Sequence, residues 1–221
     1  DMLEIGAPFS DPLADGPAIQ FSSQQALAKG LNLDGLFELV RRVRAQTAVP
    51  LLLMGYYNPL LALGVEKYLR TAADAGASGL IIPDLPPDEA GAVRSAAREL
   101  GLSLVFLVAP TSTPGRIALV DRSSTDFVYA VTVAGVTGAR DALTPETVRY
   151  LRGLRRRLSK PFVAGFGVST PAMAAQLGAL ADGVVVGSAL VETIRRAAPQ
   201  AAPAAVARSV RALRRALDSV S

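Results

Sequence analysis

Apolar residues along the chain fall into two alternating patterns. Short runs rich in Val, Leu and Ile predict buried strands, and longer stretches with apolar residues at helical spacing predict helices. The expected strands are residues 2–5, 51–54, 79–82, 103–108, 127–131, 162–164 and 183–186. The expected helices are residues 32–46, 65–75, 88–100, 113–121, 145–158, 171–180 and 202–220. Strands that alternate with helices in this way predict a parallel sheet with right-handed crossovers.

Two parallel α/β architectures fit this order of elements. Seven strands could form a doubly wound sheet, whereas a (β/α)8 TIM barrel needs eight strands and typically about 250 residues. The loops after the expected strands carry the unusual residues, and glycine motifs follow the last two strands, where such barrels bind phosphate. The chain also begins at Asp1, close to an expected strand. We therefore predict a single TIM-barrel domain over residues 1–221, truncated at its N-terminus, with the first βα unit absent.

The composition excludes several kinds of chemistry. The 221 residues include no Cys, His or Trp, so thiol nucleophiles, imidazole bases, disulfides and Cys/His zinc sites are ruled out, and we expect no metal. The three lysines are Lys29, Lys67 and Lys160, and none follows the carboxyl end of an expected strand. A Schiff-base aldolase is therefore disfavoured. Acid/base chemistry must come from carboxylates and from tyrosines.

The net charge of +4 raises the question of a nucleic-acid partner. Residues 1–140 carry 11 basic and 14 acidic side chains, whereas residues 141–221 carry 12 and 5. The basic excess falls on expected amphipathic helices, without the interleaved aromatic residues that a single-strand binder needs. We predict solvated helix faces and no nucleic-acid binding. No apolar run is long enough to span a membrane and no signal-peptide pattern opens the chain, so we expect a cytoplasmic protein with no membrane partner.

Two glycine motifs follow the last two expected strands. Gly165 and Gly167 lie in FVAGFGVST, and Gly187 and Ser188 lie in DGVVVGSAL. Glycines allow the backbone to approach a ligand, and the amide and hydroxyl of Ser188 could face an anion if a short helix begins there. The glycines could also be ordinary turn residues. Their repetition at these two positions favours a phosphate site.

The first loop, LEIGAPFSDPLADGP, contains three carboxylates within 15 residues. If Leu3 and Ile5 pack beneath helices, the period of two along a strand points Glu4 into the barrel. Burial would raise the pKa of that carboxyl group towards a range useful for acid/base catalysis. A buried Glu paired with a core Arg is the alternative, although no Arg or Lys lies near the strand ends. Asp11 and Asp15 could be turn residues.

Two further features could belong to a ligand site. Residues 131–144 contain Gly135 and Gly138 among small residues, which is typical of a flexible lid but also of a plain surface loop. Tyr56 and Tyr57 follow one expected strand, and Tyr129 lies in another. These tyrosines could wall an apolar pocket or simply cap the core.

Six segments together resemble the alpha subunit of tryptophan synthase. They are LEIGAPFSDPLADGP, LLMGYYNPL, IIPDLPPDE, GVTGAR, GFGVS and VVVGSAL, in the same order and at similar separations. The first is close to diagnostic, whereas GFG and GSA are shared with many phosphate-binding barrels. In this family a first strand and helix precede the first motif, and the chain does not contain them.

The resemblance implies a lyase that cleaves indole-3-glycerol phosphate to indole and glyceraldehyde 3-phosphate. It also implies a pyridoxal-phosphate-dependent beta subunit as partner in an alpha2beta2 complex, and no cofactor in this chain. Glu4 would be the acid/base of the retro-aldol step, and Asp15 would hold the indole N–H and stabilise positive charge as C3 is protonated. The other implied residues are Tyr56, Ile81 and Tyr129 around the indole, Gly138, Gly167, Gly187 and Ser188 at the phosphate, and Asp11, Pro12 and Asn58 facing the beta subunit.

Two classes of function are compatible with these residues. A lyase of tryptophan biosynthesis is favoured because both carboxylates are present. The alternative is a catalytically impaired fragment that acts only as a binding or regulatory module for a beta subunit. Other phosphate-binding barrels, such as a sugar-phosphate isomerase or indole-glycerol-phosphate synthase, are disfavoured. The latter is similar only in its phosphate loops and uses a catalytic Lys that has no counterpart here.

Overall fold

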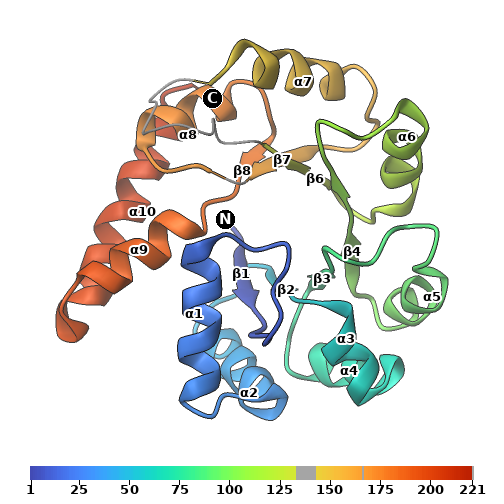
Figure 1. Ribbon diagram of the computed structural model, residues 1–221, viewed down its shortest axis with the longest axis vertical. Coiled ribbons are helices and arrows are strands. Elements are labelled where there is room, and N and C mark those ends of the chain that lie inside the picture. Colours follow the sequence, from blue (N-terminus) through green and yellow to red (C-terminus); the bar gives the residue numbers. More distant parts are fainter. Residues whose placement is uncertain (133–142, 166, 221) are drawn as a thin grey trace. The chain divides into compact units, whose positions relative to one another are not determined.

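The computed structural model describes residues 1–132, 143–165 and 167–220. The chain divides into two compact units, of which the first comprises Asp1–Phe106 and Arg122–Asp126 and the second Leu107–Asp121 and Phe127–Ser221. Each unit contains one four-stranded parallel sheet with helices beside it (Figure 1). In both sheets the order of the strands follows the chain, β1-β2-β3-β4 and β5-β6-β7-β8. A doubly wound sheet would instead reverse its strand order at a switch point.

The first unit holds the acidic loop and the strand of Glu4. Its elements are β1 (Leu3–Gly6), α1 (Pro17–Ala28), α2 (Leu33–Arg44), β2 (Leu51–Met54), α3 (Tyr57–Leu63), α4 (Val65–Asp74), β3 (Gly79–Ile81), α5 (Gly91–Glu99) and β4 (Ser103–Val105). Helix α2 begins where the Asn32 side chain accepts a hydrogen bond from the amide of Gly35, at 2.9 Å. Phe37 of α2 meets Tyr68 of α4 edge to face, with ring centroids 5.2 Å apart. These contacts bury the apolar faces of the two helices.

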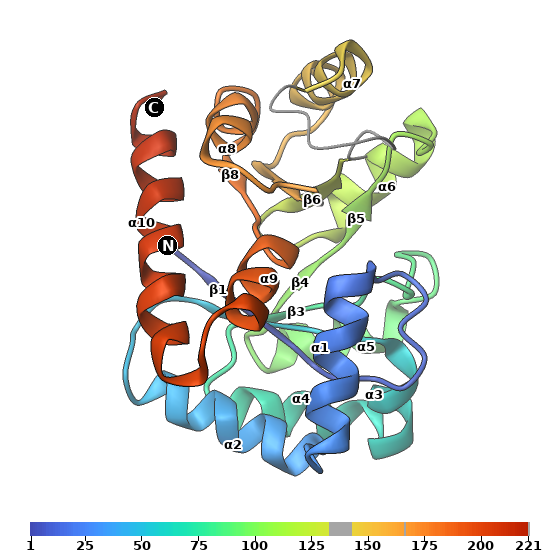
Figure 2. The same ribbon diagram turned by 60° about the vertical axis from the view of Figure 1, so that its left-hand side comes forward.

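The second unit holds both glycine motifs. Its elements are β5 (Leu107–Val108), α6 (Pro114–Ser123), β6 (Val128–Val131), α7 (Pro145–Arg155), β7 (Phe162–Gly165), α8 (Pro171–Gly178), β8 (Gly183–Val184), α9 (Ser188–Arg196), the 3-10 helix η1 (Pro199–Ala201) and α10 (Ala202–Asp218). Helices α7 and α8 begin at threonine caps, Thr144 and Thr170, each followed by proline. Helix α10 packs against α8 and α9 (Figure 2). The α8 contact is close, since a Cβ at Gly178 would lie 2.7 Å from a methyl group of Leu217.

The seven expected strands are present, with one interruption. The run 103–108 is divided into β4 and β5 at Phe106. The amide of Phe106 donates to the hydroxyl of Ser124 at 3.2 Å, and the amide of Leu104 donates to the hydroxyl of Thr125 at 3.0 Å. Side chains of the segment after α6 therefore take the place of a strand partner here.

Three helices were not among those expected. Helix α3 is only seven residues long, and in α1 the sole fully buried residue is Ser23 rather than an apolar side chain. Helix α9 begins at Ser188, where a helix start was expected, but its extent was not predicted. Sequence periodicity detects helices that bury one apolar face, and α1 and α9 bury little.

Strands β1 and β8 each lie at the end of their sheet, with one strand neighbour among the described residues. The side chain of Leu3 on β1 is 44% exposed, although strand residues of this type are usually buried.

Candidate active site

Glu4 lies on one face of the first sheet, in a row that crosses all four strands. Its register partner is Leu52, which pairs with Gly79, which in turn pairs with Ser103. A Cβ on Gly79 would lie 2.6 Å from the Cβ of Ser103 and 3.0 Å from a methyl group of Leu52, so the side chains of the row point the same way. The absence of a side chain at Gly79 lets this row close together.

The carboxyl group of Glu4 has a strongly raised pKa. Desolvation by the surrounding protein raises it from 4.5 to about 7, and the negative charge of Asp15 adds to the effect. Water still reaches the residue, which is exposed at the edge strand. No hydrogen bond or ion pair to an Arg or Lys is found for Glu4 in the described residues. The alternative of a Glu neutralised by a core Arg is therefore not what the structure contains.

Asp15 lies in the loop between β1 and α1 and is half-buried. The backbone amide of Asp15 donates to the carbonyl of Pro12 at 3.1 Å. The backbone carbonyl of Asp15 accepts a hydrogen bond from the side-chain amide of Gln20 at 2.9 Å. Burial raises the pKa of the Asp15 carboxyl group, while a hydrogen bond from the Tyr56 hydroxyl acts in the opposite direction. Its charge acts on Glu4, so the two carboxylates expected in the chemistry lie close to one another.

Tyr56 is 8% exposed and lies directly before α3. Its ring packs against Phe9 at a centroid distance of 5.3 Å, and its hydroxyl accepts a hydrogen bond from the amide of Ala14 at 2.9 Å. Sequence reasoning expected this ring at an apolar pocket but did not foresee the bond from its hydroxyl to the acidic loop. Only a folded structure brings positions 42 residues apart into contact.

Ile81 is the last residue of β3. It lies on the same sheet face as Glu4, because it is two residues along the strand from Gly79, which belongs to the row of Glu4. It is almost completely buried. Its register neighbours are Met54 on β2 and Val105 on β4. This part of the face is therefore apolar.

Tyr129 and the glycine motifs lie in the second unit. Tyr129 is 3% exposed, and a Cβ on Gly165 would lie 2.6 Å from Cζ of its ring. Gly165 thus leaves space for a protein side chain, and not only for a ligand. Gly167 has a φ of 77°, a conformation that favours glycine. Gly187 is the N-cap of α9 and Ser188 its first residue, as expected, whereas Gly138 lies outside the described residues.

The residues expected at a partner interface are accessible. Asp11 and Asn58 are exposed and Pro12 is partly exposed. Next to Pro12, Leu13 is 94% exposed, which is unusual for a leucine and was not singled out from the sequence. The signal available in the sequence was an apolar residue at the centre of an acidic, proline-rich loop.

Asp84 is a second residue whose role the sequence did not reveal. Its carboxylate accepts a hydrogen bond from the amide of Tyr57 at 2.9 Å, at the first residue of α3. It thus satisfies a free amide at the start of a helix that has no cap of its own. The segment IIPDLPPDE contains this residue, but nothing local to that segment identifies its partner.

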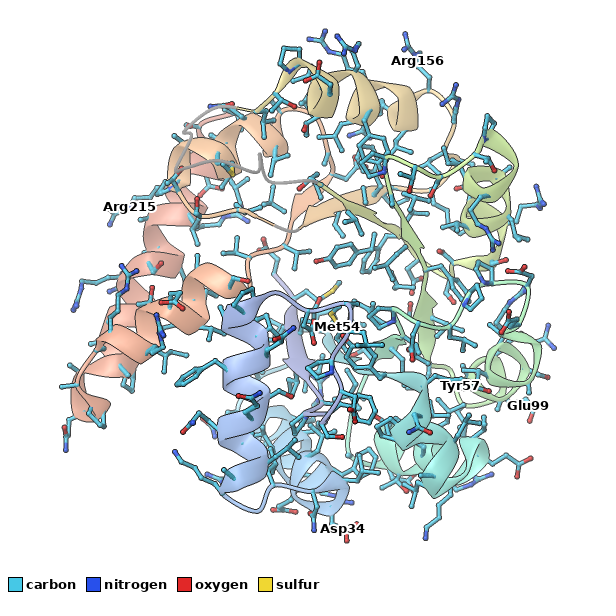
Figure 3. The ribbon with its side chains drawn as sticks, in the orientation of Figure 1. Asp34, Met54, Tyr57, Glu99, Arg156 and Arg215 are labelled. Carbon is cyan, nitrogen blue, oxygen red and sulfur yellow. The ribbon has the colours of Figure 1, made fainter. Side chains whose placement is uncertain are left out.

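Two arginines of the basic C-terminal part of the chain lie on the surface. Arg156 and Arg215 point away from the ribbon, and both are exposed (Figure 3). In the part of the chain that the structure describes, no helix is both long and apolar enough to cross a membrane. The same residues include no group of three or more carboxylates placed to hold a metal ion.

A family model described as "Tryptophan synthase alpha chain" matches residues 1–219. The chain belongs to this family. The alpha chain of Geobacter sulfurreducens is 48% identical over 219 residues, which are 99% of this chain and 83% of that protein. That of Deinococcus radiodurans is 48% identical over 195 residues, 88% of this chain and 72% of that protein.

Solved structures of the family have the same fold. The tryptophan synthase alpha subunit of Legionella pneumophila matches with a TM-score of 0.90 and 35% identity, over 99% of this chain and 82% of that one. A tryptophan synthase complex from Pyrococcus furiosus matches with a TM-score of 0.86 and 36% identity, over 96% of this chain and 85% of that one. The expected α/β class and (β/α)8 barrel are therefore confirmed.

Membership in the tryptophan synthase alpha family settles the class of reaction. The chain is a carbon-carbon lyase of tryptophan biosynthesis that cleaves indole-3-glycerol phosphate, and the family needs no cofactor in this subunit. None of the matches favours the alternative of an impaired binding module. Which residues perform the cleavage is a separate question.

Proposed function

We propose that Glu4 and Asp15 provide the acid/base and electrostatic catalysis for the cleavage of indole-3-glycerol phosphate. The reaction breaks the bond between C3 of the indole and the glycerol chain. A proton is added at C3, and the adjacent glycerol hydroxyl loses a proton as its carbon becomes the aldehyde of glyceraldehyde 3-phosphate. The electrons of the broken bond stay with the indole. Since no net proton is consumed, the step suits a group that both gives and takes protons near neutral pH.

The observation that carries the proposal is the raised pKa of Glu4. With a pKa of about 7, the carboxyl group is present in both protonated and ionised forms at neutral pH. An ordinary Glu, with a pKa of 4.5, would be almost wholly ionised and a poor proton donor. Glu4 also shares its sheet face with the apolar residue Ile81. We assign to Glu4 the proton transfers of the retro-aldol step.

We assign to Asp15 the stabilisation of the positive charge that develops on the indole. Protonation at C3 leaves the ring cationic and its N–H more acidic. A carboxylate that accepts this N–H stabilises the ring at the stage where charge has developed. The hydrogen bond from Tyr56 opposes the rise in the pKa of Asp15 and so favours its ionised form. The two carboxylates thus have different roles because their surroundings differ.

Binding of the substrate is assigned to apolar residues and to backbone amides. The family resemblance assigns Tyr56, Ile81 and Tyr129 to the indole, and each of these residues is buried. Gly167, with its positive φ, and Gly187 with Ser188 at the start of α9, would hold the phosphate, because the first amides of a helix have no partner within it. Gly138 is assigned to the same phosphate from the family resemblance.

A beta subunit is the proposed partner, in an alpha2beta2 complex in which pyridoxal phosphate belongs to the beta subunit. Structures of tryptophan synthase complexes from Pyrococcus furiosus and Mycobacterium tuberculosis support an assembly of this kind. We assign Asp11, Pro12 and Asn58 to its interface, and the exposed side chain of Leu13 adds an apolar contact to that surface.

The test is indole release from indole-3-glycerol phosphate. Wild-type chain and the variant Asp15→Asn are compared, with Asp34→Asn on the exposed part of α2 as a matched control. We expect Asp15→Asn to lower kcat/KM by about 10²-fold or more and the control to leave it unchanged. Wild-type activity in Asp15→Asn would contradict the role assigned to Asp15.

Two further predictions concern the whole chain. We propose that residues 1–221 behave as a single domain, which a single cooperative unfolding transition would support and two separate transitions would contradict. We also propose a cytoplasmic location, which the match to biosynthetic enzymes supports. Localisation of the tagged chain in cells would test it.

A further inference from the structure

The hydroxyl of Tyr56 occupies a position that binding of an indole does not explain. It accepts the amide N–H of Ala14 at 2.9 Å and gives its own proton to the carboxylate of Asp15. A tyrosine hydroxyl has only one proton to donate. Both of its interactions therefore go to consecutive residues of the acidic loop, and its proton is already committed before substrate binds.

Tyr56 is itself held by groups from three directions. The amide of Gly55, directly before it, donates to the carbonyl of Ile81 at 3.1 Å. The amide of Tyr57, directly after it, donates to Asp84 at 2.9 Å. Its ring rests against Phe9. Because the backbone on both sides and the ring are fixed, the hydroxyl is a rigid point of attachment.

The acidic loop has few other attachments near Asp15. The bond from the amide of Asp15 to Pro12 is internal to the loop, and the bond from Gln20 comes from the helix that follows it. At the tip of the loop, Leu13 is almost fully exposed. Among the described residues, the hydrogen bonds of Ala14 and Asp15 with the Tyr56 hydroxyl thus tie this part of the loop to the segment that follows β2.

Two charged groups act on Asp15 and on the Tyr56 hydroxyl that holds it. Glu4 on β1 repels it, and Asp84 in the segment after β3 acts on the Tyr56 hydroxyl. Burial raises the pKa of Tyr56 to about 12, so its hydroxyl keeps its proton throughout the range in which an enzyme works. It can therefore hold Asp15 against the repulsion from Glu4 without changing its own state.

We propose that Tyr56 is a positioning residue: its hydroxyl fixes Ala14 and Asp15 so that the Asp15 carboxylate is held where the indole N–H arrives. This rests on the proposed function of Asp15 and deepens it. The same contact connects the loop of Asp11 with the segment that contains Asn58, two residues beyond Tyr56. A partner bound to Asp11 and Asn58 would therefore affect the position of Asp15 through Tyr56.

The test is Tyr56→Phe, which keeps the ring and removes only the hydroxyl. The matched control is Tyr68→Phe on α4, where the ring packs against Phe37 away from the acidic loop. We expect Tyr56→Phe to lower kcat/KM for indole-3-glycerol phosphate about 10- to 10²-fold, mainly through kcat, and Tyr68→Phe to change it less than twofold. The acidic limb of the pH profile should also move to higher pH, since the bond that lowers the pKa of Asp15 is lost. A purely structural role would not move that limb.

A double-mutant cycle separates this inference from the proposed function. In a chain that carries Asp15→Asn, adding Tyr56→Phe should cost less than threefold, because the hydroxyl acts through Asp15. If Asp15→Asn is impaired but Tyr56→Phe has wild-type kcat/KM and an unchanged pH profile, the positioning role is wrong. If Asp15→Asn itself has wild-type activity, the proposed function fails first. A full, additive loss from Tyr56→Phe in the Asp15→Asn background would also overturn the inference.

Discussion

Replacing Glu4 with Gln should make the protein more stable at alkaline pH while removing its activity. The pKa of Glu4 is about 7 in the folded chain and 4.5 for an ordinary Glu. A raised folded pKa means that the folded state binds the proton more tightly than the unfolded state. Stability is therefore lost as the pH rises from about 4.5 to about 7, and the loss is complete above that range. Gln carries no charge at any pH and escapes this loss.

The size of the effect follows from the same two values. Each pKa unit corresponds to about 1.4 kcal/mol, so a fully desolvated group would give about 3 kcal/mol. Because water reaches Glu4, solvent screening reduces this to about 1 to 2 kcal/mol. For a chain of this length that is a rise of roughly 2 to 8 °C in melting temperature.

The assay is thermal unfolding followed by circular dichroism at pH 4, 6 and 8. Glu99→Gln serves as control, since Glu99 is an exposed carboxylate at the end of α5 that points into solvent (Figure 3). Glu4→Gln should match wild type at pH 4 and exceed it at pH 8, with the difference growing between. A gain of equal size at pH 4 and pH 8, or a variant less stable than wild type at pH 8, would refute the reasoning.

Three other predictions concern the partner surface, the second unit and its loops. Asp11→Ala should weaken activation by a tryptophan synthase beta subunit and leave the basal cleavage rate largely intact; loss of the basal rate with normal activation would place Asp11 in the chemistry. Gly165→Ala should displace the ring of Tyr129, because the new Cβ would lie 2.6 Å from its Cζ, and raise KM for indole-3-glycerol phosphate at least tenfold in steady-state kinetics; an unchanged KM would count against Tyr129 at the indole. Asp121→Asn should cost about 1 to 3 kcal/mol in urea unfolding at pH 7, since the buried carboxylate accepts bonds from the amide and hydroxyl of Ser159. Burial raises the pKa of Asp121, but these hydrogen bonds outweigh burial and the pKa is lowered from its ordinary value of 3.8. The stabilisation is therefore present above about pH 3.8 and is lost as the pH falls further. An Asn variant that is equally stable at pH 7, or a difference that persists undiminished at pH 2, would contradict this.

The fold could be predicted from the sequence wherever burial imposes a regular period. Helix α2 buries Leu36, Phe37 and Val40 on one face, and its range was expected to within a few residues. Helix α1 buries only Ser23, whose hydroxyl is bonded to the backbone of Phe9, so its sequence has no apolar face to detect. The break at Phe106 depends on a bond to a distant serine side chain and leaves no local signal.

The candidate site was predictable for residues whose role depends on a strand. A raised pKa of Glu4 was expected from burial without a basic partner and is present, whereas Leu3, which was expected to pack beneath helices, is 44% exposed. The contacts of Tyr56 and Asp84 were not predictable, because each joins segments that are far apart in the sequence. A resemblance to a family supplies roles for residues, but only the structure shows which atoms hold them in place.

The most direct test of the account is the pH dependence of kcat/KM for cleavage of indole-3-glycerol phosphate by wild type and by Glu4→Gln. The account predicts an inflection near pH 7 in wild type, set by the raised pKa of Glu4. In Glu4→Gln it predicts a loss of at least about 10²-fold and no inflection near pH 7 in the residual activity. An unchanged inflection in Glu4→Gln, or a rate close to that of wild type, would contradict the claim that Glu4 is the acid/base.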